Sequence, residues 1–245
     1  MLITNLRVSV VDNKVEKLIL DIDHLDIMEE QKNIVLGPNG SGKSTLAQVI
    51  VGNPDYIISS GEIIYKDQNI LSIGAHERAK LGIFMTFQYP LEVPGVNYFE
   101  YLKLIYDQSF PDEKMNVFHF RTKLREILKQ LDIDEVFINR NLNEGFSGGE
   151  KKKMEIVQLL LLKPKFLILD EIDSGLDIYS LDLVLKVLKE YINENHPTVL
   201  AISHYSKIFD YIEPDNIIVM KNGNIHTTGG MDLARKITSQ GNFDI

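Results

Sequence analysis

Nine consecutive residues have the spacing of a phosphate-binding loop. Gly37–Thr45 reads Gly-Pro-Asn-Gly-Ser-Gly-Lys-Ser-Thr and matches the pattern G-x-x-x-x-G-K-[ST] between a predicted strand and a predicted helix. Glycines let backbone N–H groups turn toward a phosphate, and the helix N-terminus adds partial positive charge. The pattern predicts that Lys43 reaches the β- and γ-phosphates and that the Ser44 hydroxyl ligates Mg²⁺. The predicted nucleotide-binding residues are Gly37, Pro38, Asn39, Gly40, Ser41, Gly42, Lys43, Ser44 and Thr45.

Two carboxylates follow a wholly apolar stretch further along the chain. Phe166–Leu169 reads as a strand buried on both faces, and Asp170 and Glu171 come directly after it. Asp170 is suited to hold the Mg²⁺ water shell, and Glu171 is then placed to polarise an attacking water as a general base. The alternative is an ordinary acidic strand end at the surface, which the phosphate loop upstream disfavours.

Three further short segments lie where predicted elements begin or end. Ser147–Glu150 opens a predicted helix and offers a hydroxyl and backbone N–H groups to an anion, although Ser-Gly-Gly alone predicts only a helix cap. Ser174–Asp177 precedes the next predicted helix. His204 follows the predicted strand Val199–Ser203, and its alternative interpretation is a structural histidine at a strand end.

The elements that must position these residues alternate between strand and helix. The other predicted strands are Leu2–Val11, Lys17–Ile27, Asn33–Leu36, Gly61–Tyr65, Gly82–Gln88 and Ile217–Met220. The predicted helices run from the phosphate loop through Gly52, near His76–Leu81, over Tyr98–Asp107 and Val117–Leu131, from Gly149 to Leu162, and over Leu181–Asn195. Alternation with short apolar strands predicts an α/β fold with a mostly parallel sheet, and residues 89–143 form a helical insertion.

Composition excludes several classes of protein. The 245 residues are 44% hydrophobic and 25% charged, which is typical of a globular chain rather than a disordered one. A net charge of −9 argues against a nucleic-acid binder. No cysteine is present, so this chain alone builds no disulfide, thiolate zinc site or iron–sulfur cluster. No apolar run approaches 18 residues and the N-terminus resembles no signal peptide, so we expect no direct membrane insertion.

The motifs, taken in order, resemble those of the ATP-binding-cassette (ABC) ATPases. Gln88 matches the Q-loop of that family, Ser147–Glu150 its signature segment, Ser174–Asp177 its D-loop and His204 its switch histidine. The resemblance covers essentially the whole chain. It implies a single domain of residues 1–245, with a nucleotide-binding core (1–90 and 164–245) that includes an N-terminal antiparallel β subdomain, and a helical lobe (about 91–163).

The resemblance also implies the roles of individual residues. Two protomers are expected to form an ATP-dependent head-to-tail homodimer, with each ATP between the phosphate loop of one and the signature segment of the other. The signature residues Ser147, Gly148, Gly149 and Glu150 and the D-loop residue Asp177 then complete the nucleotide site in trans. The implied catalytic residues are Lys43, Gln88, Glu171 and His204, and the implied Mg²⁺ ligands are Ser44, Gln88 and Asp170.

Several residues depart from the transporter motors of this family. The signature segment ends in Glu150 rather than Gln, and Ile172-Asp-Ser follows Glu171 where Pro-Thr is usual. These features resemble the ATPase of the Suf iron–sulfur assembly machinery, SufC, including its plastid-encoded counterparts. The resemblance implies SufB and SufD as scaffold partners, contacts through Tyr89–Tyr101, and a location in bacterial cytoplasm or plastid stroma. The alternatives are a transporter motor and a regulatory module with negligible turnover.

Three local departures lead to further expectations. Glu30-Gln31-Lys32 replaces the usual Gly-Glu turn, so this turn must form without glycine. Val8–Val15 holds no aromatic residue to stack on adenine, which predicts modest ATP affinity and poor base selectivity. Lys151–Lys153 forms either a solvated basic face or, through Lys152, an ion pair with Glu171 that weakens the general base.

Overall fold

The computed structural model describes residues 1–172, 175–203 and 211–240, and its chain divides into two compact units. The first unit holds Met1–Met85, Lys165–Glu171 and the described residues from His196 onward. The second unit holds Thr86–Pro164 and Ile172–Asn195, so it extends beyond the predicted lobe of about 91–163.

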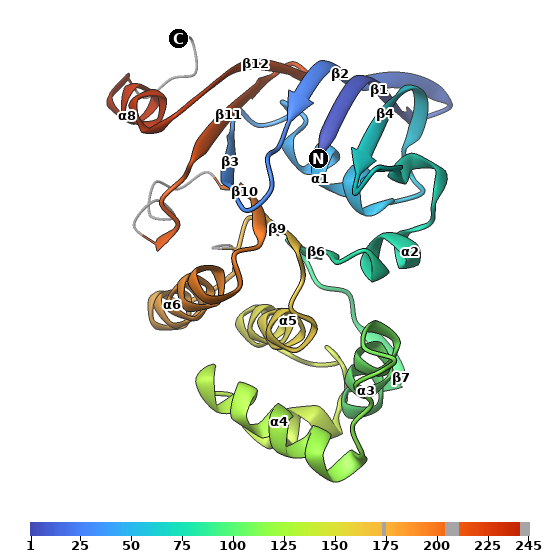
Figure 1. The fold of residues 1–245 in the computed structure, drawn as a ribbon, viewed down its shortest axis with the longest axis vertical. Helices are drawn as coiled ribbons and strands as arrows, with labels where there is room; N and C mark the ends of the chain where they lie inside the picture. Colours follow the sequence, from blue (N-terminus) through green and yellow to red (C-terminus); the bar gives the residue numbers. More distant parts are fainter. Residues whose placement is uncertain (173–174, 204–210, 241–245) are drawn as a thin grey trace. The chain divides into compact units, whose positions relative to one another are not determined.

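An antiparallel sheet forms the N-terminal part of the first unit. It has the order β2-β1-β4-β5, with β1 at Leu2–Asp12, β2 at Val15–Asp26, β4 at Ile57–Tyr65 and β5 at Gln68–Asn69 (Figure 1). Inward-facing side chains such as Ile3, Leu6 and Ile63 are fully buried, because one face of the sheet packs on the core. The predicted antiparallel β subdomain is therefore confirmed.

The second sheet of this unit is mostly parallel, as the short apolar strands predict. Its order is β12-β11-β3-β10-β9-β6, in which β11–β3, β3–β10 and β10–β9 pair in parallel and β12 pairs antiparallel to β11. Every residue of β9 and β10 is buried. The strands run at Asn224–Gly229 (β12), Asn216–Lys221 (β11), Lys32–Leu36 (β3), Thr198–Ile202 (β10), Phe166–Asp170 (β9) and Ile83–Thr86 (β6).

The described residues of this unit form three α-helices. Helix α1 spans Lys43–Val51, and the short helix α2 spans Ala75–Lys80 after the 3₁₀ turn η1 at Ile70–Ser72. Helix α1 ends at Gly52, whose φ of 85° is the left-handed conformation that glycine favours at a helix C-terminus. Helix α8 spans Met231–Gln240; neither it nor strand β12 was predicted.

The second unit is built mainly from helices. These are α3 (Tyr98–Ser109), α4 (Val117–Gln130), α5 (Gly148–Leu162), α6 (Ile178–Asn195) and the 3₁₀ turn η2 (Glu135–Asn139) (Figure 1). The side chains of Asn97 and Asn116 accept hydrogen bonds at the N-termini of α3 and α4. The predicted helix over Val117–Leu131 is confirmed by α4, whose apolar side chains Phe120, Leu124, Ile127 and Leu128 are buried, as is Leu131 directly after it.

A two-stranded ladder interrupts the predicted helical insertion. Strand β7 (Val93–Asn97) pairs with the two-residue strand β8 (Asn141–Leu142). Strand β7 was not predicted because its partner, β8, lies far from it along the chain. The turn at Glu30 forms without glycine, as predicted, since Glu30 itself adopts a φ of 60°. Among the described helices, none combines the length and apolar character needed to cross a bilayer.

Candidate nucleotide-binding site

The phosphate loop approaches neighbouring backbone at distances that only glycine permits. At Gly37 the φ is 153°, and a Cβ atom would lie 2.2 Å from the Met220 carbonyl oxygen. At Gly42 the φ is 100°, and a Cβ atom would lie 2.5 Å from Leu20 Cδ2. Gly40, by contrast, borders open space. The loop is therefore held between strands β11 and β2 at its base, while its tip is left open.

Lys43 is buried within this loop. Its ammonium donates hydrogen bonds to the carbonyl oxygens of Gly37 (2.9 Å) and Pro38 (3.0 Å). Burial lowers the pKa of Lys43, while Glu171 and Asp170 act in the opposite direction. The charge is thus held by the loop carbonyls and by two carboxylates of its own unit.

Ser44 and Asp170 meet although 126 positions separate them. The Ser44 hydroxyl donates to Asp170 Oδ1 at 3.1 Å, and the Asp170 side chain is almost completely buried. Ser44 lies in the first turn of α1, and Asp170 ends strand β9. The fold therefore brings together two of the three Mg²⁺ ligands that the sequence predicts.

The donor set fits a nucleotide with Mg²⁺. The Ser41 hydroxyl is buried and has no hydrogen-bond partner among the described residues, which suits it to a phosphate oxygen. The hydroxyl of Ser44 and the carboxylate of Asp170 are oxygen ligands of the kind that Mg²⁺ prefers beside substrate phosphates. Pro38 and Asn39 are exposed at the tip, and Thr45 is half-buried behind it.

Glu171 has an unusual backbone conformation. Its φ of 46° lies in the left-handed region, which costs about 1 kcal/mol or more for a residue other than glycine. Its N–H donates to the Ile202 carbonyl at the end of β10, at 3.0 Å. This conformation turns the chain directly after Asp170, so the two adjacent carboxyl groups do not continue the strand alternation. No sequence signal predicted it.

His204 lies outside the described residues, as does Ser174 of the predicted D-loop. The described part of this region ends with β10 and Ser203, in agreement with the predicted strand Val199–Ser203.

The signature segment caps helix α5 in the second unit. Glu150 N–H donates to Ser147 Oγ at 3.3 Å, and Ser147 N–H donates to Glu150 Oε2 at 2.6 Å, which together form a capping box. A Cβ atom added at Gly148 would lie 3.5 Å from the Gly175 carbonyl oxygen, so this helix start lies against the D-loop.

Asp177 occupies the equivalent position before helix α6. Its Oδ1 accepts a hydrogen bond from Ser180 N–H at 3.0 Å, and this contact lowers the pKa of the exposed Asp177 carboxyl. The predicted residues Ser147, Gly148, Gly149 and Asp177 therefore lie at or before the N-termini of α5 and α6. Gln88 belongs to the same unit, is half-buried, and follows strand β6 by two residues.

The solvated interpretation of Lys151–Lys153 is wrong for its first two members. Lys152 is 1% exposed; its ammonium donates to the Phe87 carbonyl and lies 3.8 Å from Glu155 Oε2. Lys151 forms an ion pair of 2.7 Å with Glu92. Sequence reasoning missed Glu155, although Lys and Glu three positions apart on a helix share one face. The pairing of Lys152 with Glu171 stays a prediction.

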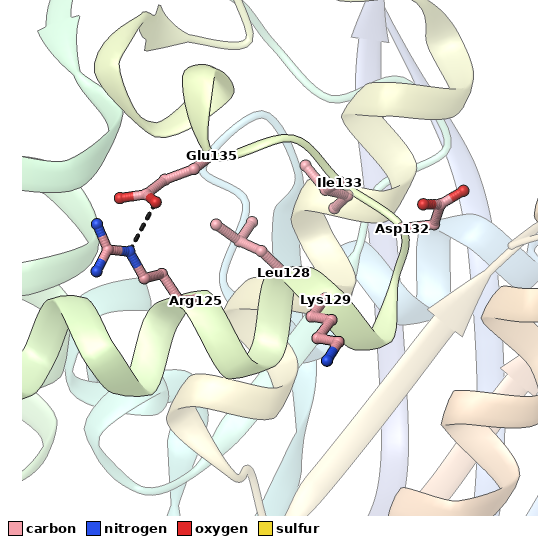
Figure 2. Close-up of a pocket in the computed structure, with 6 residues that line it drawn as sticks. All are labelled: Arg125, Leu128, Lys129, Asp132, Ile133 and Glu135. Atoms are coloured by element: carbon pink, nitrogen blue, oxygen red, sulfur yellow. Dashed lines mark hydrogen bonds and ion pairs between the residues drawn. The ribbon is translucent and has the colours of Figure 1, made fainter.

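A separate pocket of about 260 Å³ lies on the second unit, between α4 and the turn that follows it. Figure 2 shows its lining, in which Arg125 Nε pairs with Glu135 Oε2 at 2.6 Å beside Leu128. None of the predicted site residues that the structure describes lines it. We therefore do not assign nucleotide binding to this pocket.

The strand–loop–helix geometry, with Ser44 beside Asp170, defines the class of P-loop nucleoside triphosphatases. The family model described as ABC transporter matches residues 20–174. The chain belongs to this family and is an ATPase cassette that acts on ATP with Mg²⁺.

Relatives cover nearly the whole chain. "Probable ATP-dependent transporter ycf16" of Trieres chinensis is 43% identical over 242 residues, covering 98% of this chain and 94% of the relative. "Probable ATP-dependent transporter slr0075" of Synechocystis sp. is also 43% identical over 242 residues, covering 98% and 93%. Among solved structures, the chain resembles the "Dimeric Structure of MJ0796, a Bacterial ABC Transporter Cassette" with a TM-score of 0.80 and 22% identity, covering 94% of this chain and 99% of that one. This likeness confirms the fold.

Proposed function

We propose that this ATPase is the Suf-type subunit of an iron–sulfur cluster assembly machine and drives a SufB–SufD scaffold in bacterial cytoplasm or plastid stroma. Its single domain combines a nucleotide-binding core and a helical lobe. Glu150 in the signature segment and the sequence after Glu171 support this assignment over a transporter motor. The cluster would bind the scaffold, which agrees with the absence of cysteine in this chain.

The residues of the first unit would perform the hydrolytic step. Lys43, held by the loop carbonyls, would rotate onto the β- and γ-phosphate oxygens and neutralise their charge. Glu171 would accept the proton of the water that attacks the γ-phosphorus, and His204 would hold that water. Mg²⁺ bound by Ser44, Gln88 and Asp170 supplies further charge neutralisation at the phosphates.

A second protomer would complete each site. The N-terminus of α5 presents Ser147, Gly148 and Gly149, and backbone N–H groups at a helix start favour an anion such as the γ-phosphate. Asp177 would cross the dimer seam. The similar MJ0796 cassette is dimeric, which supports a dimer for this chain.

The observation that carries partner binding is an exposed apolar segment directly after Gln88. Tyr89 is 76% exposed and Leu91 is 81% exposed, although both side chains are large and apolar. Adjacent exposed apolar side chains of this size indicate an interaction surface. A scaffold protein bound at this segment would contact the residues next to Gln88 and so influence the ATPase site.

A transporter motor is the second candidate. The relatives of this chain are named as probable ATP-dependent transporters, which favours this candidate. The same exposed segment would then receive a membrane protein on another chain.

The test measures ATP turnover and oligomeric state of the purified chain, alone and with SufB–SufD of the same source. We expect slow turnover alone, stimulation by the scaffold, and loss of both in Glu171→Gln with ATP binding retained. If ATP dimerises the chain but the scaffold neither binds it nor stimulates its ATP turnover, we would instead assign the chain as a transporter motor.

A matched pair of surface variants locates the partner contact. Tyr89→Ser removes an exposed aromatic side chain from the proposed surface, and Phe118→Ser removes one of 74% exposure from α4. We expect Tyr89→Ser to weaken scaffold stimulation and Phe118→Ser to leave it unchanged. Equal effects of both variants would exclude the Tyr89 surface.

A further inference from the structure

The peptide that leads into Gln88 is held by two buried charged side chains of helix α5. Phe87 N–H donates to Glu155 Oε1 at 2.8 Å, and the Phe87 carbonyl accepts a hydrogen bond from Lys152 Nζ. Lys152 and Glu155 are 1% and 5% exposed, and Glu155 Oε2 lies 3.8 Å from Lys152 Nζ. Both hydrogen-bonding groups of one residue are thus fixed by an ion pair.

Burial of the Lys152–Glu155 ion pair is expected to cost folding free energy. Two charges removed from water repay their desolvation only with good geometry and further hydrogen bonds, and an apolar pair of similar volume is often at least as stable. Helix α5 could pack here with leucine or methionine, as it does at Met154, Ile156 and Leu159. The Lys152–Glu155 pair instead hydrogen-bonds both backbone groups of Phe87.

The same segment is fixed again downstream. Asn143 Nδ2 donates to the Leu91 carbonyl at 2.8 Å, and Lys151 on α5 forms the 2.7 Å ion pair with Glu92. The residues between these two anchors are Gln88, Tyr89 and Pro90. A half-buried glutamine is therefore carried on a short span whose ends are both fixed to the helical unit.

We propose that Glu155 and Lys152 are positioning residues for Gln88, which fix the backbone of the residue before it and so set the orientation of its side chain. This inference rests on the proposed role of Gln88 as an Mg²⁺ ligand. It also joins two features on helix α5, because its first turn carries the signature segment and its next turn holds the backbone of Phe87, directly before Gln88.

The test replaces the ion pair with apolar residues of similar volume in Lys152→Met/Glu155→Leu, so that folding is preserved while both contacts to Phe87 are lost. Amide hydrogen exchange of Phe87 and Gln88 is measured by NMR in nucleotide-free protein, and the Mg²⁺ concentration for half-maximal ATPase is measured separately. We expect exchange at least about tenfold faster and half-saturation shifted upward by about tenfold. Glu155→Gln, which keeps an acceptor for Phe87 N–H, should resemble the parent, as should the surface control Glu135→Gln.

The outcomes separate this inference from the assignment of Gln88. A folded double variant with parental exchange and parental Mg²⁺ dependence overturns the inference. If the double variant does not fold, the parent decides, because a Phe87 amide that exchanges as fast as that of exposed Tyr89 excludes the link. Gln88→Ala is the reference: parental Mg²⁺ dependence in this variant refutes the role of Gln88 itself, whatever the exchange results.

Discussion

The Ser44 hydroxyl donates a hydrogen bond to Asp170 Oδ1 at 3.1 Å and joins the first turn of helix α1 to the end of strand β9. The two residues come from segments that no local pattern connects. Parallel pairing of β9 with β10, and of β10 with β3, places the ends of these strands at one edge of the sheet. In such sheets ligands bind beyond the carboxyl ends of the strands. The relationship supports Ser44 and Asp170 as a joint Mg²⁺ site.

Substitutions at Asp170 and Ser44 should impair Mg²⁺-dependent ATP turnover to different extents. Asp170→Asn keeps the shape but removes the charge, and we expect ATP turnover to fall roughly 100-fold or more. Ser44→Thr retains a hydroxyl at the same position and should keep most of the activity. Turnover titrated with Mg²⁺ checks both. A parental Mg²⁺ response in Asp170→Asn would contradict the shared site.

The backbone at Glu171 predicts an unusual order of stabilities. Because its φ of 46° is unfavourable for a residue with a Cβ atom, Glu171→Gly should be more stable than Glu171→Ala by about 0.5–1 kcal/mol. Urea unfolding of the two variants measures the difference. Both should lack hydrolysis, because neither carries a general base.

A matched pair at an exposed helical position controls for the glycine effect. At Glu190 on α6, glycine should be less stable than alanine by about 1 kcal/mol. If glycine is less stable than alanine at both positions, the left-handed conformation of Glu171 has no energetic consequence.

Glu155 should make stability depend on pH around neutrality. Burial raises its pKa from 4.5 to about 7, and Lys152 and the Phe87 N–H only partly oppose this. The native state therefore binds more protons than the unfolded state between these values, so the free energy of unfolding decreases as pH rises from 4.5 through 7. Full ionisation costs on the order of 1–3 kcal/mol.

Urea unfolding at pH 5, 6, 7 and 8 in the parent and in Glu155→Gln checks this sign. As pH rises, the free energy of unfolding of the parent should decrease relative to that of Glu155→Gln. Tyr98 and Tyr101, which face Glu155, do not titrate in this range because burial raises the pKa of both. A pH-independent difference would contradict an elevated pKa at Glu155.

Base selectivity should be weak. The segment Val8–Val15 offers aliphatic side chains but no aromatic ring, and stacking on a ring contributes roughly 1–3 kcal/mol per base. We expect the dissociation constants of ATP and GTP to agree within about fivefold. Isothermal titration with the Glu171→Gln protein measures both without turnover, and a large preference for either base would refute the prediction.

The sequence by itself determined the local elements of this protein. Four apolar residues before Asp170 predict a buried strand, the Gly37–Thr45 pattern predicts a loop that opens a helix, and Ser147 followed by two glycines predicts a helix cap. These signals succeed because hydrophobic periodicity, glycine conformation and capping act over a few neighbouring residues.

The tertiary structure alone decided which distant groups meet. Lys152 is as consistent with a solvated face as with a buried pair when only its neighbours in sequence are considered, and its contact with Phe87 spans 65 positions. The left-handed turn at Glu171 and the ladder of β7 with β8 likewise depend on long-range packing. Burial and pairing energies come from the whole fold, so no short segment of sequence contains them.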